Sequence, residues 1–356
     1  MKQPSQHPRE IHGRGAPRNV KSRLDRLEFV RATAELTAPA PKTTLTAENA
    51  RTIITTNDSP DVPFDQSINP YRGCEHGCIY CFARPTHAYL DLSPGLDFET
   101  RILFKPNAPE LLRRALAKPG YRCRPIAMGT NTDPYQPAER LLKLTRKILE
   151  VLVEHHHPVS IVTKSTLVTR DIDLLAPLGR KNMTSVFFSI TTLDPDLARR
   201  MEPRASTPAK RLEAMATISK AGIPTGVLAS PIIPALNDDE LERILEAAAA
   251  AGARTGGYLL LRLPHEVEQL FTEWLRTHYP AKADKVLNRL RQMRGGRLND
   301  PRFEARHSGR GTHATLLRRR FELVARRLGL DFERPGLDCT KFRVPGRPGP
   351  QQSLFD

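Results

Sequence analysis

Short apolar segments of strand length alternate with amphipathic segments over the middle of this chain, and this alternation constrains the fold more than any other feature. Apolar residues recur at helical spacing in the stretches between the apolar segments. Strands in such a pattern pair in parallel and are buried on both faces, because the connecting helices cover the sheet. We therefore predict an α/β fold with six βα units, arranged as an open or partial (β/α)6 barrel. The predicted strands are 67–71, 125–129, 159–163, 184–190, 225–229 and 257–261, and the predicted helices are 107–117, 139–154, 171–178, 209–221 and 238–251.

Composition divides the chain into four parts. Residues 1–45 are polar, Pro-rich and basic without a sustained period, which predicts a flexible basic arm. The predicted barrel spans 60–265. From 266 to 344 the pattern is helical and basic, which predicts a helical extension packed against the barrel, with one apolar helix face within 314–328. Residues 345–356 begin with a Pro/Gly-rich run and are predicted to form a tail. The apolar face comprises Leu317, Phe321, Val324 and Leu328.

The formal net charge of +16 is concentrated towards the two ends of the chain. Residues 1–31 carry 8 Lys and Arg against 3 Asp and Glu, and residues 285–347 carry 17 against 6, so the rest is balanced at 30 against 30. Clustered basic residues neutralise phosphates and release counterions, so this distribution predicts contact with nucleic acid. A general bias towards arginine, or a contribution to solubility, is the alternative.

The length and the cysteine content limit the class of protein. A chain of 356 residues, 39% of them hydrophobic, is long enough for one large barrel domain with tails or for two ordinary domains. Cysteines are few and no apolar run follows Met1, which predicts a protein of the reducing cytoplasm. No stretch has the length of uninterrupted apolar residues that a membrane span requires, so no membrane association is predicted.

Three of the five cysteines, Cys74, Cys78 and Cys81, form a C-x3-C-x2-C loop. Three thiolates suit three irons of a [4Fe–4S] cube and leave the fourth iron open to a small molecule. A structural zinc site requires a fourth ligand, and Cys123 and Cys339 stand alone in the sequence. A disulfide framework does not fit an odd number of clustered thiols. The loop therefore predicts an iron–sulfur cluster.

This cysteine spacing, with the aromatic Tyr80 directly before the third cysteine, resembles the signature of the radical S-adenosylmethionine (SAM) superfamily. The resemblance implies a partial barrel, a [4Fe–4S] cluster held by Cys74, Cys78 and Cys81, and SAM bound at the open iron. It also implies cleavage of SAM to methionine and a 5′-deoxyadenosyl radical that abstracts a hydrogen atom. An electron donor such as flavodoxin or ferredoxin is the implied partner.

Barrel enzymes place their sites at the carboxyl ends of the strands, so polar residues there are the candidates for SAM contacts. Asn131, Thr132 and Asp133 follow the second predicted strand, where the superfamily holds the SAM amino group. The alternative is a capped turn before Pro134. Lys164 follows the third strand and is a candidate partner of the SAM carboxylate, with a solvated lysine as the alternative.

Three further residues are candidates for the nucleoside part of SAM. Tyr80 matches the aromatic that lies near the adenine in the superfamily, and a packing role is the alternative. Ser189 and Thr191 end the fourth strand, where the superfamily often has ribose-binding groups, although hydroxyls are common at strand ends. Asn237 and Asp238 are interpreted as a cap of the following helix.

Within the superfamily, the chain more closely resembles the DNA-repair-photolyase-like group that includes spore photoproduct lyase. This resemblance rests on the runs 69–74, 132–137 and 162–165 and extends over about 60–265. It implies a lesion or base in DNA as the substrate, and hence a DNA lyase or repair enzyme. Radical modification of RNA or protein is an alternative, and a non-catalytic DNA-bound iron–sulfur protein is another.

Two departures weaken the match to spore photoproduct lyase itself. That enzyme has a hydrogen-donating Cys at the end of the second strand, where this chain has Met128 and Gly129. It also has Tyr on both sides of the third cluster cysteine, whereas Phe82 follows it here. Cys123 is at the start of the strand, and Cys339 would serve only if the extension covered the barrel mouth. Repair of the thymine dimer is therefore not implied.

The last residues resemble the short Q-x-[SD]-L-F peptide by which polymerases and repair proteins of bacteria dock onto the sliding clamp. Gln351, Leu354 and Phe355 match this pattern, whereas Gln352 stands where Leu is usual. An extended tail can bury its two apolar residues in a groove of the partner. Packing of the tail on its own domain is the alternative.

Overall fold

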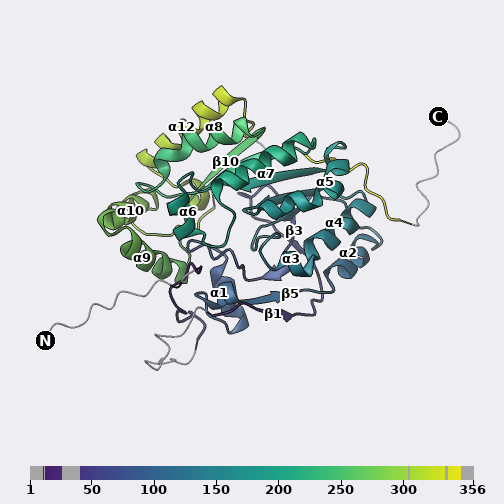
Figure 1. The fold of residues 1–356 in the computed structure, drawn as a ribbon, viewed down its shortest axis with the longest axis horizontal. Helices are drawn as coiled ribbons and strands as arrows, with labels where there is room; N and C mark the ends of the chain where they lie inside the picture. The colour runs from purple at the N-terminus through teal and green to yellow at the C-terminus, as the bar shows by residue number, and fades with distance from the viewer. Residues whose placement is uncertain (1–10, 12, 26–40, 304, 333–335, 346–356) are drawn as a thin grey trace.

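The computed structural model shows an α/β core, with helices of the C-terminal part in green and yellow packed to one side and a small second sheet below the core (Figure 1). The tail peptide that resembles a clamp-binding motif lies outside the described residues. The structure describes residues 11, 13–25, 41–303, 305–332 and 336–345.

A seven-stranded sheet forms the centre of the molecule. Its strands are β2 Ile54–Thr56, β3 Gln66–Ile68, β6 Ile126–Met128, β7 Val159–Thr163, β8 Thr184–Ser189, β9 Thr225–Ile232 and β10 Thr255–Leu260. They lie in the order β10-β9-β8-β7-β6-β3-β2, and all neighbours are parallel except β2, which is antiparallel to β3. Strands β10 and β2 are the two edges. The predicted six parallel strands in an open barrel are therefore confirmed.

The predicted helices cover the outside of this sheet (Figure 1). They are α2 Ala108–Leu116, α4 Leu144–Glu154, α5 Ile172–Gly179, α7 Pro208–Lys220 and α8 Leu241–Ala250, with short 3-10 turns η3 Thr166–Asp171 and η4 Asp238–Glu240. Their apolar sides join those of the strands in one large core, in which Ile161, Val186 and Ile244 are fully buried. Because these helix faces are buried, apolar residues recur at helical spacing in the sequence, and this spacing predicted where the helices lie.

The helix predicted over 139–154 is divided in two. Helix α3 Glu139–Leu142 ends at Lys143, which has a left-handed backbone with φ of 51°, and α4 begins after it. The buried Glu139 carboxylate accepts hydrogen bonds from the backbone N–H of Thr145 at 2.9 Å and of Arg146 at 3.3 Å. These contacts satisfy N–H groups at the start of α4 that have no partner within the helix.

A second sheet, which the sequence pattern did not indicate, lies beside α1 at the bottom of Figure 1. It consists of β1 Thr44–Ala47, β4 Tyr71–Arg72 and β5 Arg101–Phe104, in the order β1-β5-β4. The 3-10 helix η2 Arg84–Leu90 and helix α1 Asp97–Thr100 precede β5, and α6 Pro195–Met201 follows β8. Because these elements are short, they contain too few residues to show a period.

The residues after the sheet form the predicted helical extension. Its helices are α9 Glu266–His278, α10 Pro280–Met293, α11 Ala305–Ser308 and α12 Thr312–Leu328. Helix α12 lies along α8 (Figure 1) and buries Leu317, Phe321 and Val324, with Leu328 half-buried beside them, as predicted. The Arg320 guanidinium donates to both carboxylate oxygens of Glu242 at 2.6 Å. Part of the extension's charge thus attaches it to the barrel.

Residues 336–345, which we call the C-terminal strap, cross the amino-terminal edge of the sheet. The backbone N–H of Asp338 donates to Asn182 O at 2.8 Å, and that of Arg343 to His155 O at 3.0 Å. The Phe342 ring lies 5.5 Å from the ring of Tyr121. Asn182, His155 and Tyr121 precede β8, β7 and β6, so the strap lies opposite the carboxyl ends of these strands.

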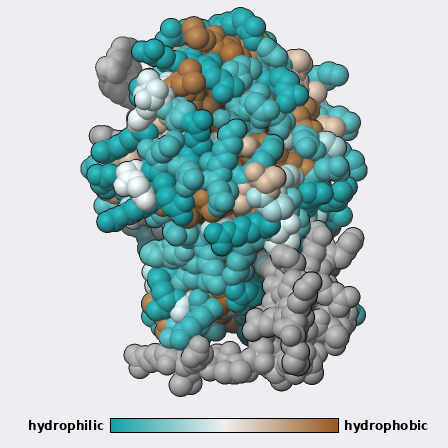
Figure 2. Space-filling model, turned by 90° about the vertical axis from the view of Figure 1, so that its left-hand side faces the viewer, coloured by the Kyte–Doolittle hydropathy of each residue, from teal (hydrophilic) through white to brown (hydrophobic). Residues whose placement is uncertain are grey.

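The surface is mostly hydrophilic on the side shown in Figure 2, where hydrophobic side chains form separate patches. In the part of the chain that the structure describes, no helix combines the length and the apolar character needed to cross a lipid bilayer.

Candidate active site

The cysteine loop runs from the end of β4, a strand of the second sheet, to the start of η2. It lies at the carboxyl-terminal edge of the main sheet. Glycines with φ of 79° at Gly73 and 68° at Gly77 allow its tight turns. Cys74 and Cys78 are buried and Cys81 is half-buried. Cys81 packs against the apolar clusters of both other cysteines, so the three thiols are neighbours.

The thiols suit a cluster better than a single metal ion. Burial raises the pKa of Cys74 well above its usual value, and it raises that of Cys78 to about 12 despite the nearby charge of Lys164. Thiols in such a place become thiolates when a bound metal supplies positive charge. Among the described residues, no three His, Cys, Asp or Glu side chains converge as ligands of one ion. A [4Fe–4S] cluster needs no such convergence, because each thiolate binds a different iron.

A buried ion pair supports the loop from below. The Glu99 carboxylate accepts from the Arg84 guanidinium, and both side chains are fully buried. Arg84 also donates to the carbonyl oxygens of Cys78 at 2.9 Å and Gly77 at 3.2 Å. The pair therefore fixes the backbone that carries the second cysteine.

Residues 13–25, which we call the N-terminal segment, complete this support. The backbone N–H groups of Gly15 and Ala16 donate to the Glu99 carboxylate at 3.0 and 2.8 Å. A Cβ atom on Gly15 would lie 1.7 Å from the carbonyl oxygen of Gly77, so only glycine allows this approach. The prediction of a flexible arm over 1–45 is therefore wrong for this segment, in which Ala16 and Val20 are buried.

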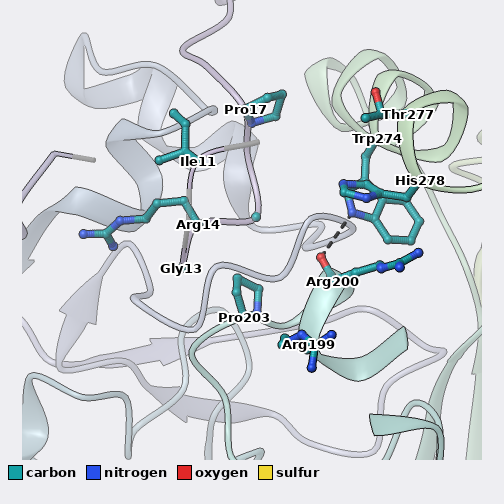
Figure 3. Close-up of a pocket in the computed structure, with 11 residues that line it drawn as sticks. Ile11, Gly13, Arg14, Pro17, Arg199, Arg200, Pro203, Trp274, Thr277 and His278 are labelled. Carbon is teal, nitrogen blue, oxygen red and sulfur yellow. Dashed lines mark hydrogen bonds between the residues drawn. The ribbon is translucent and has the colours of Figure 1, made fainter. Parts of the chain in front are cut away.

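The N-terminal segment also borders a cavity of about 300 Å³ (Figure 3). Helices α6 and α9 form its other walls, and Trp274 donates from Nε1 to Arg200 O at 3.1 Å across one side. None of the residues predicted to contact the cluster or SAM lines this cavity. It is separate from the candidate site.

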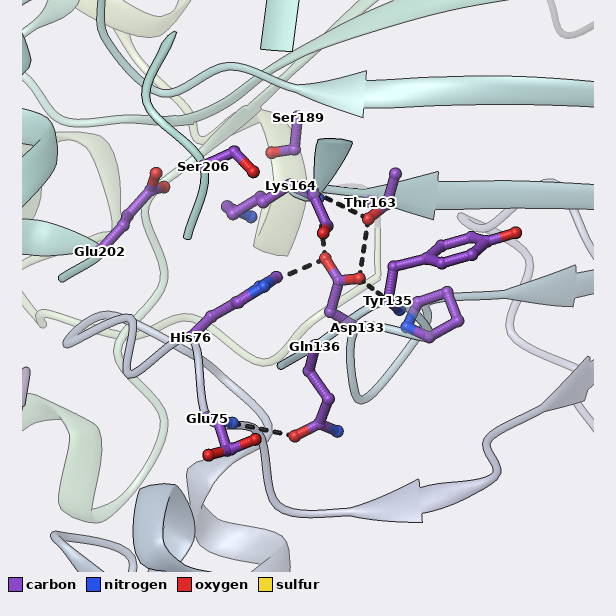
Figure 4. Close-up of polar contacts among 12 residues, drawn as sticks. Glu75, His76, Asp133, Tyr135, Gln136, Thr163, Lys164, Ser189, Glu202 and Ser206 are labelled. Carbon is purple, nitrogen blue, oxygen red and sulfur yellow. Dashed lines mark hydrogen bonds and ion pairs between the residues drawn. The ribbon is translucent and has the colours of Figure 1, made fainter. Parts of the chain in front are cut away.

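Asp133 joins the cysteine loop to the ends of two strands (Figure 4). Its carboxylate accepts from Thr163 Oγ1 and Lys164 N at 2.7 Å and from Tyr135 N at 2.9 Å. His76 Nδ1 of the cysteine loop lies 3.4 Å away. Burial alone would raise the pKa of Asp133, but His76 and these donors lower it to about 2. The carboxylate is ionised and its contacts are those of a capped turn that also positions His76.

The two residues before Asp133 differ in exposure. Asn131 N and Thr132 N both donate to the side-chain oxygen of Asn69, at 3.1 and 3.4 Å. The buried Thr132 hydroxyl donates to Tyr71 O at 3.3 Å, whereas Asn131 is exposed. Asn69 was not singled out as a site residue, although it opens one of the sequence runs used for the family resemblance. Within the described residues the exposed Asn131 side chain makes no hydrogen bond, so it is available to a ligand.

Tyr80 is fixed by a buried polar network. Its hydroxyl donates to Glu202 and lies 3.1 Å from Thr191 Oγ1, which donates to Glu202 at 2.6 Å. Glu202 pairs with the buried Arg211, which donates to Ser189 O at 2.8 Å. Burial would raise the pKa of Glu202, but Arg211 and Lys164 lower it to about 2. Glu202 and Arg211 were not predicted, because no local spacing marks their pairing.

Lys164 places a positive charge beside the cysteine loop. Its ammonium nitrogen lies 5.8 Å from the centre of the Tyr80 ring, and it makes no hydrogen bond within the described chain. Figure 4 shows Lys164 among Asp133, Ser189 and Glu202. The Ser189 hydroxyl donates to Ser230 O at 3.1 Å. The fold therefore gathers the predicted residues from the cysteine loop and from β6, β7 and β8 at one edge of the sheet.

The two other cysteines lie elsewhere. Cys123 precedes β6, and Cys339 of the C-terminal strap contacts it at the amino-terminal edge of the sheet. The extension thus does not bring Cys339 to the barrel mouth, and β6 ends at Met128 followed by Gly129. No thiol besides those of the cysteine loop is available at the candidate site.

Comparison with known proteins gives one family and several related chains. The model of the radical SAM superfamily matches residues 68–248. An uncharacterised protein of Mycobacterium bovis is 39% identical over 234 residues, which cover 65% of this chain and 68% of that protein. A structure of a spore photoproduct lyase mutant has a TM-score of 0.60 at 18% identity, covering 87% of this chain and 88% of that one. A structure of that lyase complexed with dinucleoside spore photoproduct has a TM-score of 0.56 at 16% identity, covering 81% of each chain.

Proposed function

This chain belongs to the radical SAM superfamily, and we propose that it is an enzyme that abstracts a hydrogen atom from a base or sugar of DNA. Members of the superfamily use a [4Fe–4S] cluster and SAM. When bound, these groups supply an electron and a 5′-deoxyadenosyl radical. The residues described above provide the binding groups for both.

Cys74, Cys78 and Cys81 are the proposed cluster ligands, one thiolate for each of three irons. The Arg84–Glu99 ion pair holds the backbone of their loop from one side. On the other side, the contact of His76 with Asp133 holds the loop against the strand ends. These contacts hold the loop from two sides, which favours retention of the cluster.

The observation that carries the proposal is the Lys164 ammonium, a cation beside the cysteine loop that lacks an acceptor in the described chain. We propose that it pairs with the SAM carboxylate, and that the exposed Asn131 side chain contacts the SAM amino group. The Tyr80 ring, held by Glu202 and Thr191, would pack against the adenine. The Ser189 hydroxyl donates to Ser230 O and the Thr191 hydroxyl donates to Glu202, so both oxygens retain acceptor capacity for the ribose.

Two observations support DNA as the substrate. The exposed Arg318 and Arg319 of α12 make no ion pair within the described residues, so they remain available for phosphates. A protein of similar fold, spore photoproduct lyase, has been seen with a dinucleoside photoproduct. The cysteines outside the loop lie at the opposite edge of the sheet, which favours a reaction on DNA other than thymine-dimer repair through a thiol relay.

The proposal is tested by anaerobic reconstitution with iron, sulfide, SAM and dithionite. Formation of 5′-deoxyadenosine is expected to increase with DNA over the level without substrate. Lys164→Met is expected to raise the KM for SAM at unchanged iron content, because it removes only the charge facing the carboxylate. Stimulation by RNA and not by DNA would replace the substrate class. No stimulation by either would reject nucleic acid.

The arginines of α12 give a prediction for DNA affinity. Replacing Arg318 and Arg319 with glutamine is expected to reduce the slope of log affinity against log salt by up to about 2, one unit for each lost phosphate contact. Arg320→Gln is the control, because Glu242 already occupies that guanidinium. Fluorescence anisotropy of labelled DNA at several salt concentrations measures the slopes. A slope that changes only in the control would place the contact elsewhere.

We further propose that the tail docks onto a sliding clamp through Gln351, Leu354 and Phe355. The support is the sequence pattern, because these residues lie outside the described chain. Purified clamp is expected to bind the full-length protein and to lose most of its affinity for the Leu354→Ala, Phe355→Ala double variant. Equal binding by both proteins, or binding by neither, would remove the clamp from this account.

A further inference from the structure

A large aromatic side chain is exposed next to the proposed cluster. Phe82 directly follows Cys81 and remains 42% exposed, although apolar residues around it in the loop are buried. Ile79 and Tyr80, which precede Cys81 in the loop, are buried in the core. The exposure of Phe82 thus contrasts with the burial of its neighbours. Because the cysteine loop lies at the carboxyl-terminal edge of the sheet, the exposed ring of Phe82 lies there too, and this is the edge at which substrates of barrel enzymes bind.

The guanidinium of an arginine covers one side of this ring. Arg262 follows the end of β10, and its guanidinium carbon lies 4.6 Å from the centre of the Phe82 ring. Its Nε is buried without a hydrogen-bond partner, and within the described residues its guanidinium makes no ion pair. The half-buried Arg262 side chain therefore has N–H donors, the buried Nε among them, that are available to an anionic ligand.

The groups around Arg262 keep the place positive. Asp61 is the nearby carboxylate, but Arg306 of α11 occupies both of its oxygens at 2.7 and 2.5 Å. His307 lies 3.6 Å from Asp61, and burial together with Arg262 lowers its pKa to about 4, so it is neutral at pH 7. Arg294, the third guanidinium, donates to the carbonyl oxygens of Leu260 and Leu261. Asp61 thus pairs with Arg306, and Asp300 is the carboxylate near Arg294, so within the described residues Arg262 has no carboxylate of its own.

A second exposed aromatic continues the same surface. Phe303 is 50% exposed, and the Arg306 guanidinium lies 4.9 Å from the centre of its ring. Arg306 and Arg262 are close enough to lower the pKa of Arg262 by mutual repulsion, after the larger effect of burial. Each of two interacting arginines thus lies against an exposed ring, and three separate parts of the chain contribute to this positive surface.

We propose that Phe82, Arg262 and Phe303 form the nucleotide-binding surface of this enzyme, on which a base of a single DNA strand stacks against Phe82 while its phosphate pairs with Arg262. Stacking on aromatic rings and pairing with guanidiniums are the two interactions by which proteins hold single strands. The inference rests on the proposed DNA substrate and names the residues that hold it. An acidic peptide is the competing ligand, and it would use the arginine without requiring the ring of Phe82.

The test measures binding of a single-stranded oligonucleotide that contains the fluorescent base 2-aminopurine, to cluster-loaded protein without dithionite. Phe82→Leu keeps the apolar character and is expected to weaken binding about 5- to 100-fold and to remove the quenching of 2-aminopurine that stacking causes. Arg262→Gln is expected to reduce the salt slope by about 0.7, one phosphate contact on a single strand.

Phe332→Leu is the matched control, because Phe332 is 46% exposed with the guanidinium of Arg326 at 6.0 Å, but beside α12. This variant is expected to bind like the unchanged protein. If the unchanged protein binds the oligonucleotide and Phe82→Leu binds equally with the same quenching, this inference is wrong while the DNA substrate stands. If the unchanged protein binds no oligonucleotide, or an acidic peptide displaces it equally from the protein and from Phe82→Leu, the nucleotide surface is rejected. Iron analysis of each variant excludes loss of the cluster as the cause.

Discussion

Replacing Cys74, Cys78 or Cys81 with alanine is expected to abolish the iron–sulfur cluster in anaerobically prepared protein. In the proposed site each thiolate would hold a different iron, so the two that remain would not retain the cube. Cys123→Ala and Cys339→Ala are the matched controls, because both cysteines lie at the strap on the opposite edge of the sheet. Their iron content should equal that of the unchanged protein. Analysis of iron and sulfide, with the absorption spectrum, measures the result.

The outcome that contradicts this prediction is also clear. Stoichiometric zinc without iron, even after anaerobic reconstitution, would show that the loop is a structural metal site. Retention of iron in all three single variants would show that the ligands lie elsewhere. Either result would remove the chemical basis of the proposed function.

Replacing Glu99 with glutamine is expected to lower the free energy of unfolding by about 3–5 kcal/mol, because it leaves the buried Arg84 guanidinium without its counter-charge. The N–H groups of Gly15 and Ala16 would also lose a charged acceptor. Since the same contacts hold the cysteine loop, the iron content should fall in parallel. Denaturant titration and iron analysis of the same preparations measure the two effects.

Glu154→Gln provides the comparison for Glu99→Gln. Glu154 pairs with Arg113 at 3.2 Å, but both side chains are largely exposed, and such pairs contribute about 0–1 kcal/mol. Its variant should unfold almost like the unchanged protein and keep its iron. Similar stability of the two variants would mean that solvent reaches the Arg84–Glu99 pair and that the N-terminal segment does not seal the loop.

The six parallel strands of the main sheet could be predicted because each is apolar in its own sequence, whereas the short, mostly exposed edge strand β2 could not. All six residues of β8 are buried, and the helices beside it keep one apolar side. The break at Lys143 could not be predicted, since both halves of 139–154 share one apolar period and no glycine or proline marks the left-handed residue. The N-terminal segment was hidden for another reason. Its backbone N–H groups, rather than apolar side chains, bind Glu99.

Some residues of the candidate site are marked by a local sequence pattern, and others are brought together only by the folded chain. The cysteine loop has a spacing that can be read within eight residues, and Lys164 follows directly after a recognisable strand. The pairing of Glu202 with Arg211 depends on where α6 and α7 meet the loop, which no sequence pattern records. Arg320 illustrates the opposite error. It belongs to the basic stretch 285–347 that predicted contact with nucleic acid, but its guanidinium pairs with Glu242 of α8.

The C-terminal strap determines from which end the molecule can be tethered. Its last described residue lies at the amino-terminal edge of the sheet, and only residues 346–350 separate it from the clamp-like peptide. Five residues reach at most about 17 Å when fully extended. A clamp bound by the tail would therefore lie near the amino-terminal edge of the sheet, opposite the edge that carries the cysteine loop and Phe82. An enzyme tethered in this way would be suited to a DNA strand that has already left the sliding clamp, rather than to the duplex that passes through the clamp.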